Sequence, residues 1–132
     1  MSESNTWRVG PVLGVRNVQA ATDYYTGTLG FECPGGVFQG AGEGEGGVYA
    51  VVRRGGIEIH LQIRRREVFA GERAGIESDA YIFVEDADAL CREFEAKGVV
   101  VQRALADAPY GLRDFVIEDL DGHRLAFGSP LE

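Results

Sequence analysis

An internal repeat constrains the fold of this sequence more than any other feature. Residues of like character recur 69 positions apart around a predicted strand and helix: Val15 with Val84, Asn17 with Asp86, Ala20 with Ala89 and Tyr25 with Phe94. The separation is 66 near the end of each half, where Gly56 matches Gly122, Ile59 matches Leu125 and Leu61 matches Phe127. A cap, a helix face and a turn that recur in one order indicate the duplication of one supersecondary unit.

The first half predicts one strand, one helix and three further strands. Residues 9–16 are apolar and β-branched, which is typical of a strand. Asn17 can then cap the first free amides of a helix, and Gly30 can end that helix in a left-handed conformation. The elements predicted after it are a strand that begins at Phe31, a Gly-rich loop at 40–47 and a hairpin of strands at 48–53 and 57–63.

The second half predicts the same order of elements. A strand at 79–84 precedes a helix that Asp86 can cap and Gly98 can end. The three strands that follow are predicted at 99–102, 112–118 and 123–128. The sequence therefore predicts a single α+β domain over residues 1–132, built from tandem βαβββ modules at about 8–66 and 78–130.

The charge and cysteine content narrow the classes of partner and compartment. Asp and Glu number 21 against 13 Lys and Arg, so the formal net charge is -8, which repels nucleic acid and attracts cationic solutes. Two cysteines, Cys33 and Cys91, are too few for a disulfide scaffold. The sequence shows neither a leader pattern nor an apolar stretch of membrane-spanning length. We expect a cytoplasmic protein that binds neither nucleic acid nor a membrane.

Two segments carry a resemblance to a known family. The front segment PVLGVRNVQAATDYYTGTLGF and the rear segment YGLRDFVIEDLDGHRLAFG resemble the glyoxalase, bleomycin-resistance and extradiol-dioxygenase superfamily, also called the vicinal oxygen chelate superfamily, over residues 8–130. The resemblance implies that the two modules form curled mixed sheets around a central cleft, and that the protein is a homodimer. It does not choose a function, because this scaffold hosts lyases, dioxygenases and proteins that only bind drugs.

Four positions correspond to the metal ligands of the family's enzymes. The resemblance places them at Gly10, His60, Asp79 and Ala126. A catalytic divalent ion needs about three protein ligands, and glycine and alanine offer no side-chain donor. This departure favours the metal-lacking, bleomycin-resistance branch, whose members bind a drug without a cofactor. The expected function is sequestration of a cationic or aromatic small molecule, with no catalytic residue.

A metal-dependent enzyme is the alternative that the sequence leaves open. In that interpretation His60 and Asp79 bind a divalent metal such as Zn, Fe, Mn or Ni, and water or a group of a partner chain completes the shell. The reaction would be a lyase, isomerase or dioxygenase step on a substrate with vicinal oxygens.

Strand alternation around these positions predicts which side chains face the ligand. The predicted ligand-binding set is Glu58, His60, Gln62, Asp79, Arg113, Phe115 and Arg124. Structural interpretations stay open for three of them. His60 can be a half-buried strand histidine, Asp79 a turn or capping residue, and Glu58 a polar residue on a wet face.

Overall fold

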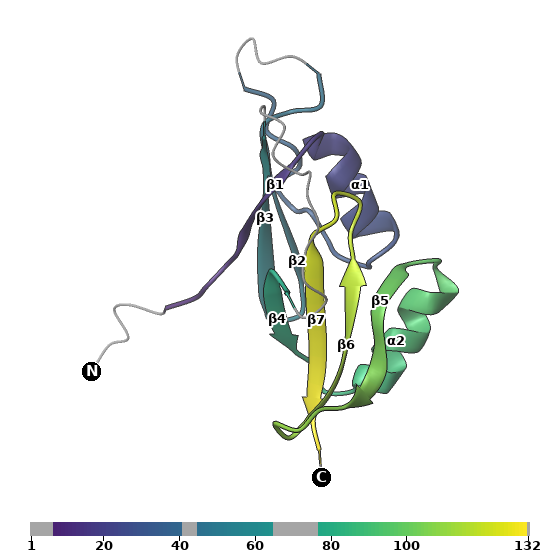
Figure 1. Cartoon of the computed structure of the whole chain (residues 1–132). Helices are drawn as coiled ribbons and strands as arrows, with labels where there is room; N and C mark the ends of the chain where they lie inside the picture. Colours follow the sequence, from purple (N-terminus) through teal and green to yellow (C-terminus); the bar gives the residue numbers. More distant parts are fainter. Residues whose placement is uncertain (1–6, 41–44, 65–76, 132) are drawn as a thin grey trace, which may run out of the picture.

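The fold consists of two βαβββ-like modules, as the repeat predicts (Figure 1). The computed structural model describes residues 7–40, 45–64 and 77–131. In chain order the elements are β1 (Val12–Val15), α1 (Val18–Gly27), β2 (Tyr49–Arg54), β3 (Ile57–Ile63), β4 (Ala80–Phe83), α2 (Ala87–Ala96), β5 (Val100–Asp107), β6 (Leu112–Glu118) and β7 (Arg124–Pro130). Residues 41–44 of the predicted Gly-rich loop lie outside the described residues.

The strand register repeats between the modules. The first sheet has the order β1-β3-β2, and the second has the order β4-β7-β6-β5. In both, the first strand of the module runs parallel to its last strand, with Val12 opposite His60 and Tyr81 opposite Ala126. Tyr81 follows Val12 by 69 positions and Ala126 follows His60 by 66, so the duplication extends to individual strand pairs.

Both helices begin at the predicted caps. The Asn17 side chain accepts a hydrogen bond from the Ala20 amide at 2.8 Å, and the Asp86 side chain accepts one from the Ala89 amide at 3.0 Å. Each bond satisfies one of the amides that a helix leaves free in its first turn. Gly98 adopts a positive φ of 79° just after α2, as its predicted position at the helix end requires.

Replacing the first cap tests its contribution to stability. We expect Asn17→Ala to lower the free energy of unfolding by about 1 kcal/mol, because the Ala20 amide loses its acceptor. Urea denaturation followed by circular dichroism measures the loss. Gln19→Ala, at an exposed position of the same helix, is the control and should change stability by less than about 0.5 kcal/mol. Equal losses in the two variants would contradict a specific capping effect.

One hydrophobic core joins the two modules. α1 packs against β2 and β3, and α2 packs against β5, β6 and β7. The largest fully buried side chains of this core come from both helices, both sheets and the segment just after α1: Tyr25, Leu29, Ile59, Leu61, Phe94, Phe115, Ile117 and Leu125. Within the described part of the chain, neither helix is long and apolar enough to cross a membrane.

Each helix makes a polar side-chain contact with the other module. Tyr25 of α1 donates a hydrogen bond to Asp119, which lies in the turn between β6 and β7. Arg54, at the turn between β2 and β3, donates two hydrogen bonds to the carboxylate of Glu93 in α2. The helix of each module therefore binds the closing hairpin of the other.

Three predicted strands differ clearly from the structure. The strand predicted from Phe31 is reduced to isolated bridges, Glu32 with Arg53 and Phe38 with Tyr49. Pro34 cannot donate to a strand ladder, and Gly36 turns the chain with a φ of 70°, so continuous pairing is interrupted. In the second module the equivalent strand is longer than the predicted 99–102, because β5 continues to Asp107 through irregular pairing with β6. The predicted strand at 9–16 shortens to β1.

Candidate functional site

The side of the sheets opposite the helices carries a set of polar and aromatic side chains. Buried core residues alternate along each strand with residues of this second side, which we call the open face. On β3 the core residues are Ile59 and Leu61, and the open-face residues between and beside them are Glu58, His60 and Gln62. Tyr81 on β4 and Asp114 on β6 alternate in the same way with core residues.

His60 is held in one orientation by two neighbours. Its Nδ1 lies 2.6 Å from the hydroxyl of Tyr49 on β2, and its Nε2 lies 3.8 Å from Oε1 of Glu58. Gly10 lies beside the imidazole, since a Cβ at Gly10 would be 3.3 Å from Cδ2 of His60. The structure thus brings together two residues of the predicted set, Glu58 and His60, and adds the phenol of Tyr49.

Glu58 is shared between two arginines. Its Oε2 lies 3.2 Å from a guanidinium nitrogen of Arg8 and 3.3 Å from one of Arg53. Arg53 stands opposite Glu58 in the strand pairing, whereas Arg8 lies in the segment before β1. The carboxylate is four-fifths buried, so these pairs are partly shielded from solvent. A ligand cation at this position would compete with two guanidinium groups.

Asp79 and Arg124 form a second group of the predicted set. Asp79 Oδ2 accepts a hydrogen bond from the backbone amide of Arg124 at 2.8 Å and lies 3.6 Å from Nδ1 of His123. The Arg124 side chain bonds to Glu118 on β6 at 3.1 Å. His123 Nε2 lies 2.7 Å from the carbonyl oxygen of Gly14, which links this turn to β1. Asp79 therefore accepts a backbone hydrogen bond, as a turn or capping residue does, and it also lies directly before the first residue of β4.

A third group surrounds Asp114, whose side chain is fully buried. The phenols of Tyr81 and Tyr110 donate to its Oδ2 at 2.8 and 2.5 Å, and the guanidinium of Arg103 lies 3.0 Å from its Oδ1. Burial alone would raise the pKa of Asp114, but these bonds outweigh it and lower the pKa below its ordinary value. Burial and the bond to Asp114 raise the pKa of Tyr81, so the phenol stays protonated.

Gly128 makes room for the Tyr81 side chain. Tyr81 reaches Asp114 across β7, where Phe83 and Asp114 flank Gly128 in the pairing of the three strands. A Cβ at Gly128 would lie 2.1 Å from the Tyr81 hydroxyl, so a side chain there would displace the phenol. The contact between Tyr81 and Asp114 therefore requires glycine at position 128.

Two residues of the predicted set lie on the helix side of the sheet. Phe115 is fully buried, stacks on Phe127 and meets Phe94 of α2 edge to face. Arg113 bonds to Asp88 in α2 at 3.0 Å and to Asp107 at 2.9 Å. These two side chains do not lie on the open face, because β6 turns Asp114 rather than its odd-numbered neighbours to that side, and their role in ligand binding stays a prediction. Gln62 lies on the open face and is exposed.

The donors at the family's metal positions do not fit a catalytic ion. His60 binds Tyr49 through one ring nitrogen, and Asp79 is engaged with the Arg124 amide. Gly10 and Ala126 have no donor atoms, and Ala126 is buried. Among the described residues, no three His, Cys, Asp or Glu side chains are grouped to hold a metal ion.

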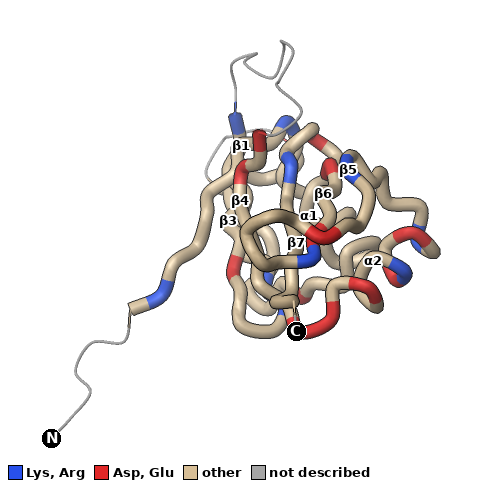
Figure 2. The backbone as a smooth tube through the Cα atoms, turned by 60° about the horizontal axis from the view of Figure 1, so that its bottom comes forward, with Lys and Arg blue, Asp and Glu red and all other residues tan. Residues whose placement is uncertain are grey.

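Sequence reasoning missed four participants of the open face. The pairing of Tyr49 with His60 could have been found, because the hairpin turn sets Val51 opposite His60 and leaves Tyr49 on the diagonal. Tyr81, Asp114 and Tyr110 meet only through the order β4-β7-β6, which no local pattern reveals. Over the described part of the chain, Figure 2 shows acidic and basic residues interspersed in both modules.

A model of one known protein family matches most of the chain. The family model described as Glyoxalase/Bleomycin resistance protein/Dioxygenase superfamily matches residues 9–127. No curated protein matches the sequence.

Solved structures resemble the whole chain. A bleomycin-binding protein from bleomycin-producing Streptomyces verticillus, complexed with copper(II)-bleomycin, is 28% identical with a TM-score of 0.67, and the match covers 97% of this chain and 100% of that chain. A glyoxalase-related enzyme from Clostridium phytofermentans is 19% identical with a TM-score of 0.72, covering 98% and 100% of the two chains. TioX from Micromonospora sp. ML1 is 21% identical with a TM-score of 0.68, covering 94% and 100%. The last two likenesses concern the fold.

Proposed function

The chain belongs to the glyoxalase, bleomycin resistance protein and dioxygenase superfamily, and we propose that it sequesters a small cationic or aromatic molecule of the bleomycin type on its open face. In this proposal the protein supplies no metal ion and performs no chemical step on the ligand. The observation that carries the proposal is the 28% identity with the bleomycin-binding protein, spread over nearly all of both chains. The unsuitable donor set at the four metal positions supports the same choice.

The chemistry of the open face suits a planar, positively charged ligand. Tyr81 lies beside the buried carboxylate of Asp114, and Tyr49 contacts His60, whose other ring nitrogen lies 3.8 Å from the carboxylate of Glu58. Aromatic faces attract cations by about 0.5 to 2 kcal/mol, and the net charge of -8 raises the local concentration of positive solutes. Because arginines already pair with both carboxylates, we infer that aromatic contact provides most of the affinity and the overall field provides the attraction.

The proposed binding unit is a homodimer in the cytoplasm. Val12 is 52% exposed and Phe83 is 71% exposed, so apolar surface lies at the edge strands β1 and β4. A second copy that covers this surface would enclose a ligand that one open face leaves accessible from one side. The free thiols Cys33 and Cys91 agree with a reducing compartment.

Calorimetric titration with metal-free bleomycin and with copper(II)-bleomycin tests the proposal. We expect binding with a dissociation constant of about 1 μM or lower, which corresponds to roughly -8 kcal/mol. Tyr49→Leu should weaken binding about tenfold, because it removes an aromatic ring from the open face and keeps an apolar side chain. Tyr24→Leu, an equal change at a partly buried position of α1, should leave binding unchanged within about twofold.

Two outcomes would contradict the proposal. One is the absence of measurable heat with either form of bleomycin at concentrations well above 1 μM. The other is a stoichiometric divalent ion in the purified protein that disappears in His60→Ala, which would favour the metal-dependent enzyme. Sedimentation velocity measures the proposed dimer separately, and a monomer at all concentrations would refute that part.

A further inference from the structure

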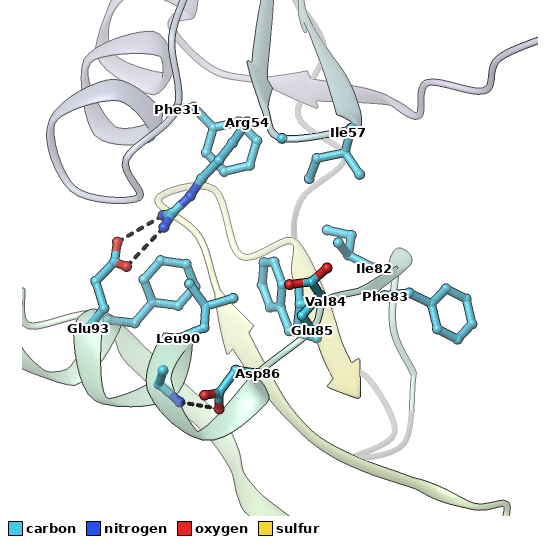
Figure 3. A pocket seen from close by; sticks show the side chains of 15 residues that line it. Phe31, Arg54, Ile57, Ile82, Phe83, Val84, Glu85, Asp86, Leu90 and Glu93 are labelled. Atoms are coloured by element: carbon cyan, nitrogen blue, oxygen red, sulfur yellow. Dashed lines mark hydrogen bonds and ion pairs between the residues drawn. The ribbon is translucent and has the colours of Figure 1, made fainter. Parts of the chain in front are cut away.

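A pocket of about 500 Å³ lies between the modules, on the helix side of the sheets (Figure 3). One wall is the turn between β2 and β3, at Arg54–Ile57, and the opposite wall is the end of β4 with the first half of α2. The strand residues Ile82 and Phe127 of the pocket point to the core side of their sheet, whereas Glu58 and His60 point to the open face. The pocket is therefore separate from the open face, and its volume is in the range of small-molecule sites.

The floor of the pocket is apolar and aromatic. Phe31, Phe94 and Phe127 contribute rings that are at least 96% buried, and Ile82 is nearly as buried. Leu90 of α2 and Ile57 of β3 line the same cavity and are partly buried. An apolar ligand group placed there would exchange water contact for contact with side chains already fixed by the core.

Charged residues occur at two places around this floor. Arg54 and Glu93 form a bidentate pair with bonds of 2.8 and 2.9 Å, and Arg54 also donates to the Leu29 carbonyl at 2.6 Å. The bonds to Arg54 keep the pKa of Glu93 below its ordinary value, so this pair stays ionised near neutral pH. Glu85 and Asp86 lie across the pocket from that pair, as Figure 3 shows.

The pocket therefore combines an aromatic floor with excess negative charge. Of its four charged lining residues, Glu85, Asp86 and Glu93 are acidic and Arg54 is basic and already bonded to Glu93. An anionic ligand would meet repulsion at the exposed carboxylates of Glu85 and Asp86 and would have to displace Glu93 to reach Arg54. A cation with an apolar body would place its charge beside these two carboxylates.

We propose that this pocket is a second ligand site that binds hydrophobic amines, with the apolar part against Phe94 and Phe127 and the ammonium group beside Glu85. The site is separate from the open-face groups around His60 and Asp114, none of whose residues lines it, although Phe83 of β4 both lines the pocket and belongs to the apolar surface proposed for the dimer. Arg54 and Glu93 join the two modules at its edge, so occupation would also strengthen the contact between them.

The probe pair 2-(1-naphthyl)ethylamine and 1-naphthylacetate tests the charge preference on one aromatic body. In calorimetric titrations of the full chain we expect the amine to bind at least tenfold more tightly than the carboxylate. Glu85→Gln should weaken amine binding severalfold, and this exposed substitution leaves the core intact. Leu90→Trp, which fills the cavity, should weaken it more than tenfold. Glu95→Gln on the same helix is the matched control and should change it by less than twofold.

The variants distinguish this site from the open face. His60→Ala should leave amine binding unchanged within twofold, and loss of binding in that variant would assign the amine to the open face and overturn the proposal. Equal affinity for the amine and the carboxylate would also overturn it. If Leu90→Trp does not fold, Glu85→Gln against Glu95→Gln decides the question, since equal effects of these two substitutions would exclude a local contact with the ammonium group.

Discussion

Phe127→Ala is expected to lower the free energy of unfolding by about 3 to 5 kcal/mol, the largest loss of any substitution considered for this protein. Phe127 is 2% exposed and lies between two aromatic neighbours, with ring centroids 5.4 Å from Phe94 and 5.5 Å from Phe115. Removal of the ring leaves a cavity between α2 and β6. Neither element can move to fill this cavity without disturbing the pairing of β6 with β7. Urea denaturation followed by circular dichroism measures the loss.

Phe38→Ala provides the matched control for this prediction. The same atoms are removed, but Phe38 is 66% exposed and should cost less than about 1 kcal/mol. Similar losses at the two positions would contradict the packing described for the second sheet. A loss at Phe127 below about 1 kcal/mol would do so as well.

Tyr25→Phe should cost about 2 to 3 kcal/mol at neutral pH through the loss of one hydroxyl group. Tyr25 is fully buried, and its phenol donates to Oδ2 of Asp119 at 2.6 Å. The other carboxylate oxygen accepts from the amides of Asp121 and His123, each at 2.9 Å. Without the phenol, a buried carboxylate lacks its side-chain donor at the junction between α1 and the β6–β7 turn.

The effect of Tyr25→Phe should depend on pH with a defined sign. Burial raises the pKa of Asp119 above its ordinary value, and the bond from Tyr25 partly offsets that rise. A carboxyl with a raised folded-state pKa loses stabilisation as pH increases from about 4 through that pKa. The substitution removes the offset and raises the folded-state pKa further, so its cost should be full at pH 7 and small below about pH 4.

Urea denaturation at both pH values checks this dependence. Tyr24→Phe, at the half-buried neighbouring position of α1, is the matched control. It should show a smaller cost at pH 7 and little change between the two pH values. An equal cost of Tyr25→Phe at both pH values would show that the hydrogen bond to the ionised carboxylate is not the source of the effect.

The elements of the fold that depend on local sequence were predictable. The caps Asn17 and Asp86 act through amides three residues away, so the helix starts follow from neighbouring residues. The parallel register of both modules follows from the repeat, because Val12 with His60 predicts Tyr81 with Ala126. The strand predicted from Phe31 is only isolated bridges, because Pro34 removes a backbone donor from the segment.

The composition of the open face was less predictable. Alternation separates two sets of residues on a strand but does not say which set faces the helix, and β6 has buried residues on both of its sides. Phe115 was therefore expected beside the ligand, although its ring completes the core with Phe94. The Asp114 group needs three strands in one order and a glycine at position 128, and these are contacts between distant parts of the chain.

The most direct test of the account is a map of amide chemical shifts during titration with bleomycin. If the open face binds the ligand, the largest changes should occur at Glu58–Gln62, Tyr81 and Asp114, while amides of α2 around Leu90 change little. Changes confined to α2 and the β2–β3 turn, or no changes at saturating bleomycin, would contradict binding at the open face.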